Sequence, residues 1–568
     1  MSRKDKNTRK NKKQTFYRVK EIAEQGDAQA QFQLGEMYVL GEGTKVNLKQ
    51  ALHWFEKSAQ QGNAQAQCHL GRMYEDGEGT TIDKDQALYW YQESAEQEHA
   101  QAQGHLGRMY FEGIGTDVDE KQAFYWFEKS AKQGNAQAQG YLGRMYSKGE
   151  GTEVNLKQAF YWSQESAQQG NAQAQYGLGV LYERGEGTRV DRKQAFHWFR
   201  KSAEQGHIVA QHNLGVLYFT GKGTAVNKKK AFYWYQKSAE QGHTVAQYNL
   251  GALYHAGEGT RVDIKQAFYW YRKSAEQGHV QAQFHLGVMH EEGEGTRVDI
   301  KQAFYWFQKS AEQGYTEAQY HLGMIYELGE GTGTEAEDEK EAFYWYQESA
   351  KQGHVNAQFR LGLLYEGGEG TEVDLKQTLY WFEKSAKQGH KRAQYYLGEM
   401  YREGEGTEVD PKQALYWYQK SAEQGHLQAQ FHLGEMYEKG EGTNADKKQA
   451  FCWFEKSAKQ GNTYAQYSLG LMYEEGHGTE VDKKKALYWY QRSANQWHEQ
   501  AQFRLGLLYE KGEGTEADEK QALHWFQKSA EQEYAEAQLH IGLYWIKKSY
   551  ESGNPRAKEV WETSKLDD

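Results

Sequence analysis

Histidine offers the most chemistry in this sequence, because imidazole binds metal ions and exchanges protons near neutral pH. The chain has 21 histidines. Two groups of them each share one position of a repeated sequence pattern. One group of eight includes His207, His243 and His279. The other group of six comprises His69, His105, His285, His321, His432 and His540.

The geometry of stacked repeats favours polar surface positions over a metal site for these histidines. Packed helices are separated by roughly 8–10 Å. The ligand atoms of a zinc site must all lie about 2.0–2.1 Å from one ion. Equivalent histidines on successive helices therefore cannot share a metal, and we expect no metal site and no cofactor.

Two further motifs suggest chemistry. The turn Gly41-Glu42-Gly43-Thr44 resembles a phosphate-binding loop, but it follows a helical pattern rather than a strand and lacks the Lys-Ser/Thr ending. Ser58 and its counterparts lack the adjacent base that a nucleophile needs. We interpret the first motif as a repeated turn and the serines as packing residues. The sequence therefore predicts no catalytic residues and no enzymatic activity.

All of these positions belong to one internal repeat. The pattern A-x-A-Q-x-x-L-G-x-M-Y-x-x-G-x-G-T-x-V-D-x-K-Q-A-F-Y-W-F-x-K-S-A-x-Q-G-N/H occurs fourteen times over residues 28–534. Thirteen copies have 36 residues, and the copy at 316–354 has 39 because three residues are inserted near Gly331-Thr332-Gly333. Such a period is typical of stacked supersecondary units that share a continuous core.

Each repeat is predicted to form two helices. Apolar residues at i, i+4, i+7 and i+8 from Ala30 give the first helix one apolar face, and Gly41 ends it. Asn47, or Asp in other copies, caps the second helix, which ends at Gly62. No segment alternates with period two, so we expect an all-α protein without strands.

Two residues inside the first helix predict how the helices pack. Gly35 costs roughly 0.5–1 kcal/mol relative to alanine in a helix, yet glycine stands at this position in all fourteen copies. We infer that Gly35 makes room for a bulky aromatic residue of the second helix. Gln31 is expected to be a buried amide that satisfies backbone groups of a loop.

These motifs resemble the Sel1-like repeat family, a relative of the tetratricopeptide repeats, over 507 of 568 residues. The resemblance implies a right-handed α/α superhelical solenoid of about fourteen 36-residue helix-turn-helix repeats. It also implies a scaffold or adaptor that binds proteins on a concave face lined by the first helices. Some members are secreted, cysteine-rich and described as binding or cleaving β-lactams, whereas this chain has only Cys68 and Cys452.

The ends of the chain differ from the repeats. Residues 1–14 hold seven Lys/Arg and one Asp, and we expect a basic disordered tail there. Residues 15–27 match the end of a second helix and are expected to cap the array, as are helices and a short polar tail within 535–568. The basic tail also leaves open attachment to nucleic acid or to a membrane surface through residues 1–14.

The variable face of the first helix is the predicted partner-binding surface. Gln29, Gln33, Glu36 and Leu40 are spaced to face one direction. The Glu36 position changes in blocks along the array, which predicts a basic patch, an apolar track with Ala252 at its centre, and an acidic stretch. The alternatives are that the track merely contacts the next helix, or that it follows from recent duplication of neighbouring units. The candidate residues are Arg72, Arg108, Arg144, Val180, Val216, Val288, Met324, Leu363, His285, His321, Arg360 and Tyr396.

Composition limits the class of protein. The formal net charge is -11, and no run approaches the roughly 20 apolar residues of a membrane helix. Two distant cysteines are typical of a reducing compartment. We therefore expect a cytoplasmic protein. The resemblance to the Sel1-like repeat family and the style of the array imply a bacterial, non-enzymatic scaffold that binds a protein or an extended peptide. The alternatives are a β-lactam-binding enzyme and attachment through the basic tail.

Overall fold

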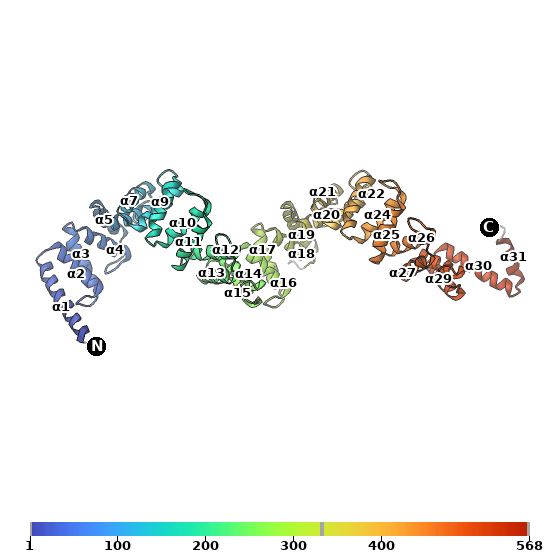
Figure 1. The fold of residues 1–568 in the computed structure, drawn as a ribbon, viewed down its shortest axis with the longest axis horizontal. Helices are drawn as coiled ribbons and strands as arrows, with labels where there is room; N and C mark the ends of the chain where they lie inside the picture. Colours follow the sequence, from blue (N-terminus) through green and yellow to red (C-terminus); the bar gives the residue numbers. More distant parts are fainter. Residues whose placement is uncertain (1–2, 330–333, 565–568) are drawn as a thin grey trace. The chain divides into compact units, whose positions relative to one another are not determined.

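The computed structural model describes residues 3–329 and 334–564. Within them the chain forms helices joined by turns and short loops, with no β-strand, so the all-α prediction is confirmed. The insertion expected at Gly331-Thr332-Gly333 lies outside the described residues. The chain divides into two compact units, Met1–Val298 and Asp299–Asp568. Figure 1 shows each unit as a succession of helices in chain order.

The repeats supply two series of helices. The first helices are α2 Ala28–Leu40, α4 Ala64–Asp76, α6 Ala100–Glu112, α8 Ala136–Lys148, α10 Ala172–Arg184, α12 Ile208–Thr220, α14 Thr244–Ala256, α16 Val280–Glu292, α18 Thr316–Glu327, α20 Val355–Gly367, α22 Lys391–Glu403, α24 Leu427–Lys439, α26 Thr463–Glu475 and α28 Glu499–Lys511. The second helices are α3 Leu48–Gln60, α5 Lys84–Glu96, α7 Glu120–Lys132, α9 Leu156–Gln168, α11 Arg192–Glu204, α13 Lys228–Glu240, α15 Ile264–Glu276, α17 Ile300–Glu312, α19 Glu335–Lys351, α21 Leu375–Lys387, α23 Pro411–Glu423, α25 Lys447–Lys459, α27 Lys483–Ala494 and α29 Glu519–Glu531.

The helix ends are set by local sequence, as predicted. Gly41 adopts a left-handed conformation with φ of 69°, and its N–H donates to the Met37 carbonyl. The Asn47 side chain accepts from the Gln50 N–H and caps α3. The same arrangement recurs at Asp83 and α5. These caps keep the two helices of a repeat short and fix the turn between them.

The group of eight histidines has a role that the sequence analysis missed. We expected polar surface residues, but each of these histidines is the N-cap of a first helix, and its Nδ1 accepts a backbone N–H. In α24, His426 Nδ1 accepts from Ala429 N at 3.3 Å. Asn63 performs the same role at α4 with its side-chain oxygen. Histidine therefore replaces asparagine here as a capping acceptor.

The packing prediction for Gly35 is confirmed, and Gln31 is a buried amide as predicted, but its backbone partner lies in the last turn of α1 and not in a loop. A Cβ atom on Gly35 would lie 2.6 Å from Cδ1 of Phe55 in α3. Gln31 is buried, its Nε2 donates to the Ala23 carbonyl at 3.1 Å, and its Oε1 accepts from Gln61 at 2.7 Å. The same pair of one buried and one exposed glutamine recurs along the array, so a ladder of amide pairs joins the two helices of each repeat.

The core lies between each second helix and the first helices on either side of it. In the first repeats, Ala51, Phe55 and Ala59 of α3 pack with Phe32 of α2 and with Leu70 of α4. Each second helix thus packs against the first helix of its own repeat and against the first helix of the next. A single hairpin cannot bury the apolar face of its second helix, so neighbouring hairpins complete the core.

The N-terminal segment differs from the expected disordered tail. Helix α1 runs from Arg3 to Glu24 without interruption. Residues 3–14 contain neither glycine nor proline, so nothing in their sequence breaks the helix. Lys12 Nζ lies 2.8 Å from Glu42 Oε1, and Phe16 is buried against Leu34 and Trp54.

Two helices follow the last repeat. They are α30 Ala535–Glu551 and α31 Pro555–Ser564. Within the described helices, no segment combines the length and the apolar character that crossing a membrane requires.

Candidate interaction surface on the first helices

The first-helix face is the surface formed by residues at the positions of Gln29, Gln33, Glu36 and Leu40 in each first helix. Gln29, Gln33 and Leu40 are exposed, whereas Glu36 is half-buried. The opposite side of each first helix carries the buried Gly35 and Leu34 positions. The first-helix face is therefore the part of the first helices that can meet another molecule.

The predicted basic patch is neutralised by carboxylates. Arg72 Nη2 lies 4.0 Å from Glu78 Oε2, and Arg144 Nη2 lies 3.2 Å from Glu150 Oε1. Arg108 pairs with Glu75 of the preceding repeat. The three arginines do lie at equivalent positions, but their charge is shared with glutamates of the turns and of the neighbouring helix, so this end is not a simple basic surface.

Glu75 is the centre of a buried polar cluster that the sequence analysis did not anticipate. Its side chain accepts from Tyr91 Oη at 2.9 Å and from Arg108. Burial alone would raise the pKa of Glu75, but the hydrogen bonds from Arg108 and Tyr91 outweigh burial and lower it. The cluster therefore keeps a carboxylate charged in a buried position and ties α6 to the preceding hairpin.

Equivalent clusters of glutamate, tyrosine and arginine occur in the second unit. Glu327 accepts from Tyr346 and pairs with Arg360 Nη1 at 3.0 Å. Glu474 accepts from Tyr490 at 2.6 Å and lies 3.8 Å from Arg504. Arg360, predicted to contact a partner, is thus engaged in a contact within the chain.

The apolar track lies partly against the core in the first unit. Val180, Val216, Ala252 and Val288 are all half-buried. Val180 packs beside Phe199 and Leu217, and Val216 packs against the cluster that contains Leu214 and Tyr235. Each of these side chains therefore packs partly against the core and is partly exposed on the first-helix face.

The second unit continues the pattern with larger side chains. Met324 packs near Tyr346, and Leu363 packs near Phe382; both are half-buried. Further along, Glu399 is bound by Arg402 at 2.7 Å, and Glu435 pairs with Lys439 at 3.7 Å. As in the first unit, the charges of the predicted acidic stretch are largely compensated by neighbouring residues.

The aromatic and imidazole candidates stack on rings of the chain itself. His285 stacks on Tyr271 with ring centroids 5.2 Å apart, and His321 stacks on Phe307 at 5.1 Å. Tyr396 contacts Phe382 at 5.5 Å. These contacts join successive hairpins, and stacking of the same side chains on a ligand stays a prediction. Burial lowers the pKa of His285, so its ring is predominantly neutral near pH 7.

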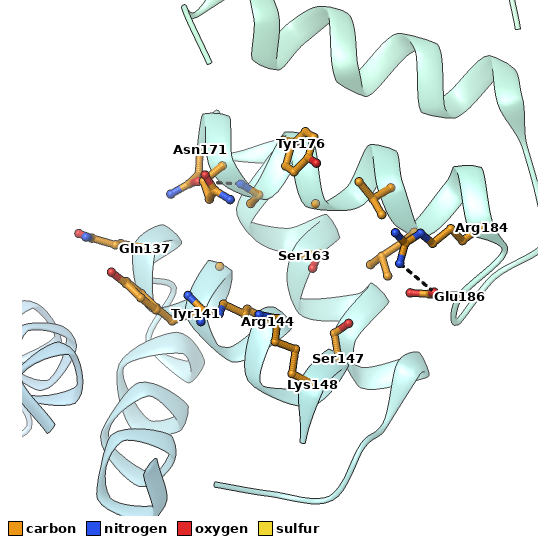
Figure 2. Close-up of a pocket in the computed structure, with 17 residues that line it drawn as sticks. Gln137, Tyr141, Arg144, Ser147, Lys148, Ser163, Asn171, Tyr176, Arg184 and Glu186 are labelled. Carbon is orange, nitrogen blue, oxygen red and sulfur yellow. Dashed lines mark hydrogen bonds and ion pairs between the residues drawn. The ribbon is translucent and has the colours of Figure 1, made fainter. Parts of the chain in front are cut away.

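The second-helix rings that take part in these stacks form a row with one gap. The aromatic position of the second helix is Phe or Tyr in thirteen repeats and Ser163 in the remaining one. Next to Ser163 the structure has a pocket of about 740 Å³, lined by residues of α8, α9, α10 and the turn that follows α10 (Figure 2). Arg144 and Val180 from the predicted surface line it. The single missing aromatic residue was the signal in the sequence that could have located the pocket.

Metal-binding groups and cysteines are the remaining candidates for chemistry in the described part of the chain. No three His, Cys, Asp or Glu side chains there lie close enough together to hold a metal ion. Both cysteines are free, with Cys68 buried and Cys452 exposed. Burial raises the pKa of the Cys68 thiol to about 12, so it stays protonated at neutral pH.

Comparisons with known proteins cover the whole array. The Sel1 repeat model matches fourteen consecutive segments, from residues 28–63 to 499–534. Among solved structures, a protective antigen present in uropathogenic Escherichia coli strains, which displays an SLR fold, is 37% identical with a TM-score of 0.68; the match covers 79% of this chain and 97% of that one. A Sel1 repeat protein from Oxalobacter formigenes is 31% identical with a TM-score of 0.43, over 54% of this chain and 89% of that one. No curated protein matches.

Proposed function

This chain belongs to the Sel1 repeat family, and on that premise we propose that it is a non-enzymatic scaffold that binds a protein or an extended peptide on the first-helix face, along the concave side of the array. Sel1 repeat proteins are in general scaffolds for protein interactions. The specific surface and the type of ligand are our proposal.

One observation carries the proposal. In the first unit, Val180, Val216, Ala252 and Val288 place apolar side chains at the same position of four successive first helices. They are half-buried, so each keeps some surface exposed. A regular row of apolar side chains with no charge of its own suits an extended polypeptide, because the ligand can bury one side chain per repeat.

The polar residues beside this row support a polypeptide ligand. Asn213 and Asn249 lie one helical turn before Val216 and Ala252, and both are half-buried. Asn249 Nδ2 lies 3.1 Å from His212 Nε2, which fixes the position of its amide. A side-chain amide has two donors and one acceptor oxygen, so these groups have capacity left for the backbone of a bound chain.

We assign the scaffold to the bacterial cytoplasm. The free state of both cysteines supports a reducing compartment, and the 37% identical structure comes from a bacterium. Cell fractionation tests the assignment, since recovery in the secreted fraction would contradict it.

The binding face is tested by affinity purification with quantitative mass spectrometry. The test variant is Val216/Val288→Asp, and the matched control is Val226/Val298→Asp, because Val226 and Val298 are 58% and 61% exposed in turns of the same repeats. Circular dichroism confirms that both variants are folded. We expect partners to be lost from the test variant and retained by the control. Unchanged recovery with the test variant would contradict the proposal.

A further inference from the structure

The hairpin junction around Ser163 lacks three side chains that form the ring stack elsewhere. In the preceding junction, Phe127 of α7 stacks on Tyr141 of α8 with centroids 4.6 Å apart and an interplanar angle of 6°. One junction earlier, Tyr91 stacks on His105 at 4.8 Å. At the next junction the corresponding residues are Ser163 and Gly177. The third missing side chain is that of Gly140 in α8, which stands at the position of Phe32 in the first repeat.

The missing rings leave open space because the helices close only part of the gap. A Cβ atom on Gly143 would meet the Ser163 backbone nitrogen at 3.0 Å, so α9 approaches α8 more closely where no ring separates them. A Cβ atom on Gly177, in contrast, would have no atom within 4 Å. The resulting pocket of about 740 Å³ falls in the range of about 300–1,000 Å³ that is typical of ligand sites.

The walls of the pocket are held in place from outside it. Tyr141 is fixed by its stack on Phe127, and Tyr176 stacks on His207 with centroids 4.8 Å apart. The Arg144 guanidinium lies over the Phe111 ring, 4.9 Å from its centroid. Figure 2 shows Tyr141 and Arg144 on one side of the pocket and Tyr176 on another. A preorganised wall of this kind lowers the entropy cost of binding.

The rim carries more positive than negative charge. Arg144 and Lys148 share one carboxylate, Glu150, at 3.2 and 3.8 Å. Arg184 pairs with Glu186 at 3.6 Å (Figure 2). At the floor, the Ser163 hydroxyl forms no hydrogen bond with the described residues. The pocket therefore has rigid aromatic walls, a hydroxyl group at its floor and one more positive than negative charge at its rim.

We propose that this pocket binds an aromatic side chain of a partner polypeptide, with an adjacent Asp or Glu held at the rim by Arg144 and Lys148. The inserted ring takes the place of the ring that Phe127 or Tyr91 supplies at the neighbouring junctions. The inference rests on the proposed scaffold function and specifies the anchor residue of its ligand. Aromatic anchors in preformed pockets commonly dominate the energy of such interfaces.

The charge of the rim decides between possible occupants. A basic peptide would meet Arg144, Lys148 and Arg184 with like charge, and a purely aliphatic one would add no second carboxylate for Arg144 and Lys148, which share Glu150. A carboxylate next to the ring completes the pairing that Glu150 supplies to two cations at once.

A phage-displayed library of random heptapeptides, selected on the full chain, tests the inference. We expect an aromatic residue next to Asp or Glu to be enriched. Gly177→Tyr, which introduces the residue found at the equivalent Tyr141, is expected to weaken binding of the selected peptides about tenfold or more in fluorescence polarisation. If tyrosine disturbs folding, Gly177→Gln, which introduces the side chain found at Gln33, is expected to weaken binding of the selected peptides as well. Val154→Tyr is the control, because Val154 is 60% exposed in the loop between α8 and α9 and does not line the pocket, and it should leave binding unchanged.

The possible outcomes distinguish failure of the pocket proposal from failure of the scaffold proposal. Peptides that lack an aromatic residue, or that bind Gly177→Tyr as tightly as the natural chain, would overturn the pocket. If such peptides are nevertheless lost with Val216/Val288→Asp, the scaffold function stands without it. If the selection enriches no sequence above background, or if neither variant weakens the selected peptides, both proposals fail. Replacing the aromatic residue of a selected peptide by alanine should reduce binding as strongly as Gly177→Tyr.

Discussion

Gly107 of α6 lies against the ring of Phe127 of α7, so closely that a Cβ atom on Gly107 would come within 2.8 Å of the ring atom Cδ1. The contact explains why glycine is kept inside a helix, where it is otherwise unfavourable. The ring in turn stacks on Tyr141 of the next repeat. One glycine thus sets the distance between two helices and also the position of a third.

Gly107→Ala is expected to destabilise this hairpin. The added methyl group overlaps the Phe127 ring, and overpacking costs about 1–3 kcal/mol, which exceeds the gain in helix propensity of about 0.5–1 kcal/mol. Urea unfolding together with amide exchange in α6 and α7 measures the effect. The matched control is Gly177→Ala, where the methyl group enters open space; this variant should become more stable. Equal effects of the two variants would show that the ring contact does not determine the cost.

Loss of a buried glutamine should open the array locally. Gln103 is 1% exposed, donates to the Ala95 carbonyl at 3.1 Å and accepts from Gln133 at 2.8 Å. Gln103→Ala removes one donor from the Ala95 carbonyl, which keeps the Glu98 N–H at 3.0 Å, and removes the acceptor of the exposed Gln133 amide, so we expect a cost of about 0.5–1.5 kcal/mol. Faster amide exchange in α6 is the expected readout. Gln92→Ala, at an exposed position of α5, should leave exchange in α6 unchanged.

The capping histidines should make stability depend on pH on the acid side. Burial, together with the positive charges of Lys391, Arg392 and His432, lowers the pKa of His426 to about 4. The unfolded value is about 6.5, so between pH 6.5 and 4 the unfolded state binds more protons than the folded state. The contribution of His426 is therefore complete above pH 6.5 and is lost as pH falls toward 4. Protonated Nδ1 also cannot accept from Ala429 N.

His426→Asn should remove part of this dependence. Asparagine caps α4 at Asn63, so the variant keeps a cap that does not titrate. We expect the loss of stability between pH 7 and pH 4.5 to shrink by about 1 kcal/mol, measured from urea midpoints. His524→Asn replaces an exposed histidine and serves as the control. A pH profile of His426→Asn that matches the natural chain would contradict the explanation.

The buried Glu75 cluster predicts a specific non-additivity. Arg108→Gln removes the charge that pairs with a carboxylate only 6% exposed, and we expect a loss of about 1–3 kcal/mol at pH 7. Adding Glu75→Gln should restore part of this loss, because no buried charge is then left unpaired. A double-mutant cycle measures the coupling. If the two changes in the free energy of unfolding simply add, the interaction between Arg108 and Glu75 does not contribute to stability.

The helical fold could be predicted from sequence because its determinants are local. Asn47 caps the helix that begins at the next residue, Gly41 ends the helix it follows, and Gly35 contacts a ring in its own hairpin. Each of these relations is contained within one repeat. A period of 36 residues then extends them along the chain.

The candidate surface was less predictable because its contacts join different repeats. The pairing of Arg108 with Glu75 links positions 33 residues apart, and nothing in a single repeat indicates that they meet. The imidazole of His285 was expected to face a ligand but stacks on Tyr271 of the previous hairpin. The pocket beside Ser163 depends on Gly177 of the next repeat as well.

Site-specific photocrosslinking tests the central claim most directly, namely that the first-helix face holds the partner. Val216 on this face and Val226 in the exposed turn are each replaced by p-benzoylphenylalanine, and the chain is irradiated with its partner recovered by affinity purification. We predict that the partner is crosslinked from position 216 and not from position 226. A partner crosslinked from position 226 alone would contradict the account.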